Sequence, residues 1–449
     1  MNIGIIGAGV TGLTAAYDLS RAGHRVTVYE ARPYAGGLAA GFSDERWAWP
    51  LERFYHHWFA TDRHVLGLID ELGASEHVFF PRPTTTLYYQ GRLYPLDSPV
   101  PALRFIPISA LHRALRVLSF SPIPLVDRLR AGLVGFYLTL TRNWQPLERV
   151  TADEWLRRYI GERAYDVLWK PLLISKFGEE YYRQVNMAWM WARLKARTTR
   201  LGTFEGGFQR FADLFSQHLR TLGVEIRLQT PVMRIEPQAE TGSLRVRSEV
   251  EEEYDRVLVT LSPQALTQLV PSLPEQYGSG LRRLKSMGAV VMVLSLRQRL
   301  SREGYYWYNL PKAAGFPFLA LVEHTNFVSP RHFGGDHIVY LGDYLEPEHE
   351  YFRLSQDELL ERFLPSLTKI NPAFERSWIR KVWLFRTAYA QPVPLVNHSA
   401  NIPPIATPVP GLYLASMSQV YPWDRGTNFA VEIGRRAARQ IMTQAPPIR

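Results

Sequence analysis

The sequence predicts an α/β protein whose principal domain is built on a parallel sheet with helices on both faces. Residues 2–23 read as a buried strand, a glycine-rich turn and an amphipathic helix, and a second strand follows them directly. A later apolar run, residues 255–261, is typical of a parallel strand buried on both faces. The length of 449 residues exceeds what one core supports and suits two domains.

The first turn carries three glycines at the spacing GxGxxG. Gly7 permits a tight turn, Gly9 leaves no side chain between backbone and phosphate, and Gly12 lets the helix lie close to the strand. The helix N-terminus then suits a pyrophosphate. The second strand, residues 25–29, delivers Glu30, an acid at the position that accepts hydrogen bonds from a ribose 2′-OH. On its own the glycine pattern also fits an ordinary turn, but this context predicts a Rossmann-like dinucleotide-binding domain.

A second diglycine, Gly36-Gly37, favours FAD over NAD, because it allows a further close backbone approach beyond Glu30. The chain has no cysteine, so the flavin cannot be tethered through sulfur and we expect noncovalent FAD. The predicted cofactor contacts in this segment are Gly7, Ala8, Gly9, Val10, Thr11, Gly12, Glu30, Ala31, Arg32, Gly36, Gly37 and Leu38.

At these residues the chain resembles the FAD-dependent amine oxidase superfamily. That superfamily includes flavin amine oxidases, protoporphyrinogen oxidase, phytoene-desaturase-like enzymes and, more distantly, UDP-galactopyranose mutase. The resemblance implies a discontinuous FAD-binding domain of residues 1–78, 201–261 and 400–449. It also implies an inserted α+β substrate domain of residues 79–200 and 262–399, in the amine-oxidase and glutathione-reductase-2-like arrangement.

Two later segments supply further parts of the FAD domain. Gly206-Gly207 precede an amphipathic helix that closes at Gly223, and residues 224–228 and 231–235 read as strands. The resemblance places this region beside the adenine, with a main-chain contact at Val232.

The C-terminal segment from Gly411 reads as a strand, a loop and a helix that begins near Thr427. It resembles the last FAD motif of the superfamily, although Ser416-Met417 stand where that motif has an acid. Asp424 and Arg425 in the loop are either an ion pair or cofactor contacts. The cofactor contacts implied here are Trp423, Gly426, Thr427, Asn428 and Phe429.

The inserted domain shows two local signals and one resemblance. Residues 84–96 alternate around Gln90-Gly91, which indicates a hairpin, and Thr151 with Glu154 forms a capping box. The run that follows Thr151 resembles the helical part of the protoporphyrinogen-oxidase branch.

Residues 98–142 combine arginines with apolar side chains, and Asp127 is the only acid among them. This composition suits helices in a bilayer interface with guanidinium groups on lipid phosphates. Ordinary core-packed helices with a solvated basic face are the alternative. The net charge of +10 also favours an anionic partner, and no nucleic-acid motif accompanies it.

Four residues are candidates for the chemistry. His56 and His57 lie in a segment that the resemblance brings beside the flavin ring, where a histidine can orient substrate or move a proton. Arg386 and Tyr389 resemble a segment that approaches the flavin just before the last motif. The aromatic run Tyr305–Tyr308 suits either a cavity wall or a core strand. The histidine spacing does not suit a metal site, and we expect none.

The sequence therefore predicts an FAD-dependent oxidoreductase that dehydrogenates or desaturates a hydrophobic polyprenoid, carotenoid-like or polycyclic substrate by hydride transfer to flavin N5. The first alternative is a non-redox isomerase of the UDP-galactopyranose mutase type, and the second is a membrane-associated binding protein with a structural FAD. With the first strand at the start of the chain and no leader before it, we expect a cytoplasmic protein, peripheral on the inner membrane face. The oligomeric state stays open.

Overall fold

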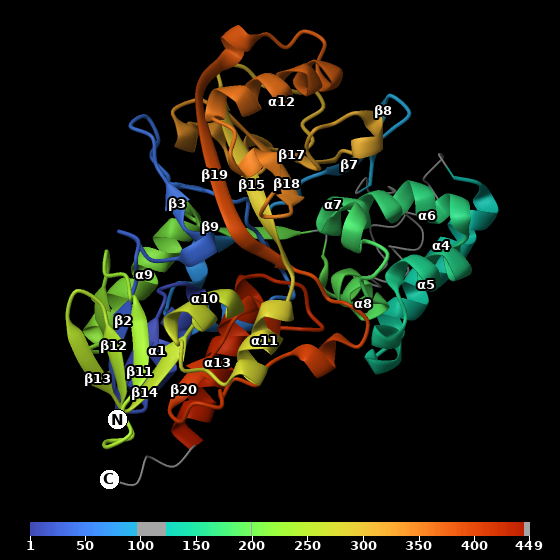
Figure 1. Cartoon of the computed structure of the whole chain (residues 1–449). Coiled ribbons are helices and arrows are strands. Elements are labelled where there is room, and N and C mark those ends of the chain that lie inside the picture. Colours follow the sequence, from blue (N-terminus) through green and yellow to red (C-terminus); the bar gives the residue numbers. More distant parts are fainter. Residues whose placement is uncertain (97–122, 199, 444–449) are drawn as a thin grey trace.

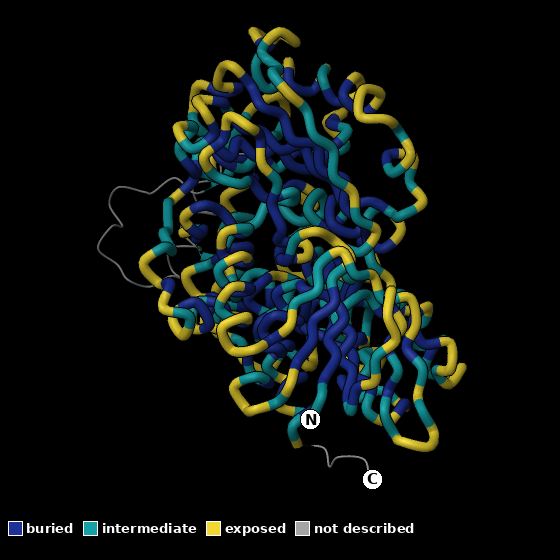
Figure 2. Tube along the Cα trace, turned by 90° about the vertical axis from the view of Figure 1, so that its left-hand side faces the viewer, coloured by how far each residue is buried: buried dark blue, intermediate teal, exposed yellow. Residues whose placement is uncertain are grey.

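The computed structural model describes residues 1–96, 123–198 and 200–443, and it confirms the predicted α/β fold class (Figure 1). One part of the molecule holds a parallel sheet with its helices. The other part holds a large mixed sheet, and a group of helices lies beside it. Buried strands run through the middle of both parts (Figure 2).

The parallel sheet has five strands in the order β10-β2-β1-β14-β20. Its strands come from three separate stretches of the chain, because β10 and β14 lie about 220 residues or more after β1 and β20 lies near the C-terminus. The strand bounds are β1 Asn2–Ile6, β2 Arg25–Tyr29, β10 Glu225–Arg227, β14 Arg256–Val259 and β20 Leu412–Leu414.

Four helices pack on this sheet and on one another: α1 (Val10–Arg21), α2 (Arg63–Glu71), α9 (Gly207–Thr221) and α13 (Thr427–Thr443). The packing of α13 on α1 is close, since a Cβ at Gly434 would lie 2.6 Å from the carbonyl oxygen of Thr11. Helix α13 begins at the predicted residue.

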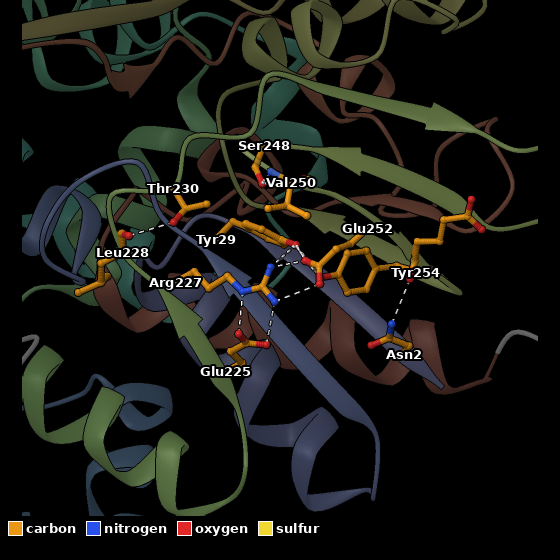
Figure 3. Close-up of polar contacts among 11 residues, drawn as sticks. Asn2, Tyr29, Glu225, Arg227, Leu228, Thr230, Ser248, Val250, Glu252 and Tyr254 are labelled. Atoms are coloured by element: carbon orange, nitrogen blue, oxygen red, sulfur yellow. Dashed lines mark hydrogen bonds and ion pairs between the residues drawn. The ribbon is translucent and has the colours of Figure 1, made fainter.

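An antiparallel sheet of β11 (Arg234–Pro237), β12 (Leu244–Arg247) and β13 (Glu251–Tyr254) adjoins the parallel one. A polar cluster joins them (Figure 3): the hydroxyls of Tyr29 and Tyr254 lie 2.6 Å apart, and Arg227 bridges Glu225 and Glu252. The cluster ties β2 to β10 and β13 immediately before Glu30. Strand β11 starts at residue 234 rather than 231, so Val232 lies in the preceding loop.

Two helices that follow β14, α10 (Pro263–Leu269) and α11 (Glu275–Arg283), pack on the parallel sheet through Leu266, Leu269 and Leu281. Residues 263–284 therefore share a core with the FAD-binding part, although the boundary predicted at residue 261 assigns them to the substrate domain.

The mixed sheet has seven strands in the order β19-β15-β18-β17-β16-β7-β8. The predicted hairpin is present as β7 and β8, with Gln90 and Gly91 at φ values of 49° and 78°. Helix α12 (Gln356–Ile370) covers one face of the sheet through an apolar core. The strand bounds are β7 Thr85–Tyr89, β8 Arg92–Pro95, β15 Ser286–Leu296, β16 Trp307–Asn309, β17 Ala320–Glu323, β18 His337–Leu345 and β19 Ile379–Pro392.

The helical group contains α4 (Leu125–Leu140), α5 (Ala152–Ile160), α6 (Glu162–Leu168), α7 (Lys170–Tyr181) and α8 (Met187–Ala196). The Thr151 hydroxyl caps α5 by accepting a hydrogen bond from the Glu154 amide at 3.1 Å. Most of the basic-apolar segment 98–142 lies outside the described residues, and its last part forms α4.

Short strands connect these parts: β3 (Gly41–Phe42) pairs with β4 (Leu51–Glu52), while β9 (Leu201–Phe204) pairs with β5 (Trp58–Phe59) and β6 (Val78–Phe79). None of the described helices combines the length and the hydropathy that a bilayer crossing requires.

Candidate active site

A cavity of about 680 Å³ opens at the carboxyl ends of β1, β2 and β14, where Gly7, Glu30 and Thr260 follow the strands. Ligands of open α/β sheets bind at this edge. The cavity extends from the glycine turn to β19 of the second sheet, so both parts of the molecule contribute to its lining. Its volume lies within the range of about 300–1,000 Å³ that is usual for cofactor sites.

The glycines at this turn are required for different reasons. Gly7 has φ +109°, and a Cβ at Gly12 would lie 2.0 Å from the Gly7 carbonyl oxygen. The protein's own backbone geometry and packing therefore require glycine at positions 7 and 12. Gly9 has an ordinary φ of −73°, and its Cβ would meet nothing closer than the Gly37 Cα at 3.8 Å. Because Gly9 lines the cavity, the space beside it is left for a ligand.

The N-terminus of α1 supplies the anion-binding groups. No side chain caps this helix end and no acid lies in its first turn, so its free N–H groups are available to a pyrophosphate. Glu30 sits next to it: its Oε2 accepts from the Ala8 amide at 3.0 Å and its Oε1 from the Arg32 amide at 2.9 Å. These bonds hold the carboxylate at the cavity, where a ribose hydroxyl can donate to it. The residues present thus fit a dinucleotide.

Most of the predicted cofactor contacts line this cavity. They are Gly7, Gly9, Val10, Thr11, Glu30, Arg32, Gly36, Gly37, Leu38, Gly426 and Thr427. Ala8, Gly12 and Ala31 belong to the same backbone without lining it. Val232 packs against the core of the parallel sheet.

At the last motif, three predicted contacts make structural interactions within the protein. The Asn428 side chain caps α2, because its Oδ1 accepts from the amides of His64 and Val65 at 2.9 and 3.2 Å. The rings of Trp423 and Phe429 stack on each other at 5.4 Å. None of these three lines the large cavity.

Sequence reasoning missed several residues that line the same cavity. Arg53 and Tyr34 form one side, with the guanidinium carbon 4.0 Å from the ring centre. On other sides the missed lining residues are Phe54, Leu261, Ser262, Ala265, Leu384, Phe385, Thr387, Met417, Val420, Ala430 and Ile433. No local motif marks them, since they come together only when the two sheets meet.

A smaller cavity of about 40 Å³ continues inward from the large one and shares part of its lining, including Leu38, His56 and Arg425. We call it the inner cavity; the rest of its lining is Phe54, Tyr55, Ala289, Val291, Asp343, Tyr344, Thr387 and Ala390. Asp343 is fully buried, and burial raises its pKa to about 7 although the Lys312 ammonium lies 2.8 Å from its Oδ2.

His56 lines both cavities, and its Nδ1 lies 2.5 Å from the carbonyl oxygen of Phe54. Burial lowers its pKa to about 4, so the ring is neutral near pH 7. His57 has a pKa lowered to about 3 by burial and packs on Phe59. It lines neither the large nor the inner cavity, so of the two candidates only His56 faces the site.

Arg386 and Tyr389 both reach the large cavity, but their polar ends are occupied. Arg386 is exposed, and its guanidinium donates to the carbonyl oxygens of Tyr351 and Leu354. The Tyr389 hydroxyl bonds the Ser418 hydroxyl at 2.8 Å and accepts from the Ser418 amide at 3.0 Å. Tyr389 therefore positions the turn after β20.

The run Tyr305–Tyr308 leads into strand β16, which starts at Trp307, and its tyrosines at 306 and 308 belong to the core, which decides against the cavity-wall alternative. Tyr306 and Tyr308 are fully buried in two apolar cores. The Tyr308 hydroxyl bonds Ser301 and Glu323, both at 2.6 Å. These side chains line neither the large nor the inner cavity.

The two loop residues Asp424 and Arg425 have different roles. Asp424 pairs with Arg193 of α8 at 3.0 Å and also accepts from Trp189 and Gln391. Arg425 lines both the large and the inner cavity, and its Nε donates to Gln391 Oε1 at 3.0 Å. The side-chain ion pair between Asp424 and Arg425 is thus replaced by a pair with Arg193.

With this geometry in place, comparison with known proteins defines the class. Residues 10–442 match the family of flavin containing amine oxidoreductases, and the chain belongs to that family. Membership implies a flavin cofactor.

Curated relatives include zeta-carotene desaturase of Synechocystis, 26% identical over 260 residues that cover 55% of this chain and 53% of the relative. The 15-cis-phytoene desaturase of Synechococcus elongatus is 35% identical over 178 residues, which cover 37% of this chain and 35% of the relative. The chain spans about a third to a half of the length of the first such relatives.

Solved structures share the fold. A protein assigned as a protoporphyrinogen oxidase, from Exiguobacterium sp. 255-15, has a TM-score of 0.75 at 20% identity and covers 99% of both chains. A reduced UDP-galactopyranose mutase has a TM-score of 0.74 at 16% identity, covering 99% of this chain and 96% of the other.

Proposed function

We propose that the protein is an FAD-dependent oxidoreductase that desaturates a hydrophobic substrate, carotenoid-like or of another polyprenoid or polycyclic kind. The observation that carries the proposal is the inner cavity, whose volume of about 40 Å³ suits only the reacting part of such a substrate. It continues from the dinucleotide cavity and is lined mainly by apolar side chains such as Leu38, Phe54 and Val291. The likeness to zeta-carotene and phytoene desaturases supports the substrate class.

The cofactor is proposed to be FAD, held without a covalent bond. Three features suit the pyrophosphate and ribose of a dinucleotide: the open space beside Gly9, the free N-terminus of α1 and the Glu30 carboxylate. A flavin held by these residues would supply, at N5, the acceptor for the hydride that leaves the oxidised C–H bond.

The chain's own residues then have positioning roles. Neutral His56, fixed by the Phe54 carbonyl, orients the substrate without adding charge. Leu38 and Phe54 exclude water from the reacting carbon. Tyr389 holds the turn at Ser418, so we assign it a positioning role.

A mutase-type use of the flavin is the second candidate, and one observation favours it. Arg425 lines both cavities with only its Nε bonded within the described residues, so a cation is available for a diphosphate. Arg193, the other arginine near it, is already paired with Asp424. Within the described part of the chain no second arginine lines the inner cavity, and desaturation is therefore the better-supported function.

We further propose that α4 attaches the protein peripherally to an anionic membrane surface. Seven large apolar residues of α4 are exposed, among them Val126 at 66% and Leu133 at 69%. The α4 stripe, as we call it, consists of Leu125, Val126, Leu129, Leu133, Phe136, Tyr137 and Leu140. Arg130 and Arg142 are exposed beside it, which gives the apolar face and cationic flank of an interfacial helix. A position on the inner face of the cell membrane agrees with this attachment.

Product analysis tests the function. Purified protein, vesicles containing zeta-carotene or phytoene, and a quinone as electron acceptor are incubated in the dark, and the extracted pigments are separated. The expected result is a product with at least one more conjugated double bond, formed in proportion to protein. If neither these pigments nor a tetrapyrrole or polycyclic terpene yields a dehydrogenated product, the proposal is wrong.

A further inference from the structure

Two buried basic side chains from distant parts of the chain meet at the Tyr344 ring, and of the two only Arg425 lines the inner cavity. Lys176 comes from α7 and Arg425 from the loop before α13, and both lie on the ring of Tyr344 in β18. The Lys176 ammonium is 4.1 Å from the ring centre and the Arg425 guanidinium carbon is 4.9 Å from it. Tyr344 and Arg425 both line the inner cavity.

Around the Tyr344 ring, the nearby carboxylates are already paired with other cations. Asp424 is committed to Arg193 by a 3.0 Å ion pair, and Asp343 is paired with Lys312 at 2.8 Å. Lys176 is 6% exposed and makes no ion pair or hydrogen bond within the described parts of the chain. Arg425 bonds only Gln391 through its Nε among those residues, which leaves both terminal nitrogens without a partner.

Burial lowers the pKa of Lys176 well below its usual value, and the Arg425 and Arg193 charges lower it further, because buried cations lose hydration and Asp424 offsets only part of this cost. A site that keeps two such basic side chains beside a cavity is suited to a ligand that brings the missing negative charge. The geometry is appropriate: the guanidinium presents two N–H donors to a planar or tetrahedral oxyanion, and the ammonium adds a point charge.

We propose that Lys176 and Arg425 bind a carboxylate or phosphate group of an otherwise apolar substrate. The substrate is then a lipophilic anion whose charged end lies at Tyr344 and whose apolar part lies along Leu38, Phe54 and Val291. This inference rests on the proposed function for the location of the substrate, and it narrows the substrate class.

Binding of three matched probes tests the proposal with the flavin-loaded protein. Farnesoate and farnesyl phosphate carry the two candidate anions on the same chain, and farnesol carries none. Binding is followed by calorimetry and by the change in the oxidised flavin spectrum. At least one anion should bind tenfold or more tightly than farnesol, and the stronger of the two identifies the anion.

Two substitutions locate the effect. Lys176→Met and Arg425→Gln should each reduce the preference for the anion to about twofold or less, while Arg425→Lys keeps part of it. Arg362→Gln removes an exposed cation from α12 and should leave the preference unchanged. Should Arg425→Gln lose flavin, Lys176→Met carries the test, because Lys176 does not line the cofactor cavity.

Equal binding of farnesoate, farnesyl phosphate and farnesol would overturn the proposal. So would a preference that persists in Lys176→Met and Arg425→Gln, or a loss of binding by all three probes alike. Because the readout is binding in the oxidised protein, a failure of the desaturase assay leaves this result interpretable by itself.

Discussion

Among single residues, Gly9 reports most directly on the cofactor. Gly7 and Gly12 are demanded by φ and by backbone packing, whereas a side chain at Gly9 meets no protein atom closer than 3.8 Å. Gly9→Val should therefore leave the fold intact and abolish FAD retention, because the valine occupies the space of the pyrophosphate. The flavin released on denaturation, measured per protein chain and identified by mass, checks this.

The control is Gly67→Val, an exposed glycine of α2 with nothing within 4 Å of its added Cβ. It should bind FAD as the parent protein does. Retention of a full complement of FAD by Gly9→Val would show that the dinucleotide does not lie at this turn.

His324 allows a pH prediction outside the site. The ring is buried among Phe327, Phe333 and Tyr340, and burial lowers its pKa to about 3. An unfolded histidine has a pKa near 6.5, so between pH 6.5 and about 3 only the unfolded chain takes up the proton. This group therefore lowers the free energy of unfolding as pH falls through that window, by up to about 1.4 kcal/mol per pH unit.

His324→Phe removes the group that takes up this proton on unfolding. Urea unfolding at pH 7, 6 and 5 should show a shallower loss of stability for the variant than for the parent protein. Identical slopes for the two proteins would mean that His324 is protonated in the folded state.

At the level of elements, the ion pair of Arg193 and Asp424 joins α8 to the loop that precedes α13. Both groups are largely buried, so Arg193→Ala or Asp424→Ala alone leaves an uncompensated charge and should cost about 3 kcal/mol or more. The double variant should cost clearly less than the sum of the single ones. Additive losses in a double-mutant cycle, measured by denaturant unfolding, would show that the pair is not coupled.

The α4 stripe predicts an effect on membrane binding. Leu133→Glu with Phe136→Glu should lower co-sedimentation with vesicles of phosphatidylcholine and phosphatidylglycerol at least about tenfold, because two apolar side chains worth about 1.5 kcal/mol or more each no longer insert. Met233→Glu with Val250→Glu adds the same charge to exposed apolar positions elsewhere and should bind as before. Unaltered binding by the α4 variant would refute attachment through this helix.

The elements differ in how far sequence could predict them. The glycine turn, Glu30, the hairpin at Gln90 and the Thr151 cap depend on local periodicity and turn chemistry, and the structure confirms each. Alternation in Tyr305–Tyr308 fits a core strand and a cavity wall equally, so only packing could decide. Lys176 lies in an apolar stretch of α7, and its approach to Tyr344 depends on contacts that no local pattern specifies.

In the whole molecule, the site lies where the carboxyl edge of the parallel sheet meets β15, β18 and β19 of the mixed sheet. The residues that suit the dinucleotide belong to the part with the parallel sheet, and most of the inner cavity belongs to the part with the mixed sheet. The dinucleotide residues could be predicted because one continuous segment encodes them. The inner cavity could not, because residues from 38 to 425 line it and their approach follows from the assembly of both sheets.

The central claim is that the flavin of this protein is reduced by a hydrophobic donor. Anaerobic mixing of the flavin-loaded protein with zeta-carotene, phytoene or a tetrapyrrole in vesicles tests it most directly, with the spectrum of the oxidised flavin recorded over time. We predict that at least one donor bleaches the oxidised band and that its dehydrogenated product appears in matching amount. An oxidised band unchanged by every donor, together with ring interconversion of a nucleotide sugar only by the dithionite-reduced protein, would contradict the account and establish the mutase-type reaction.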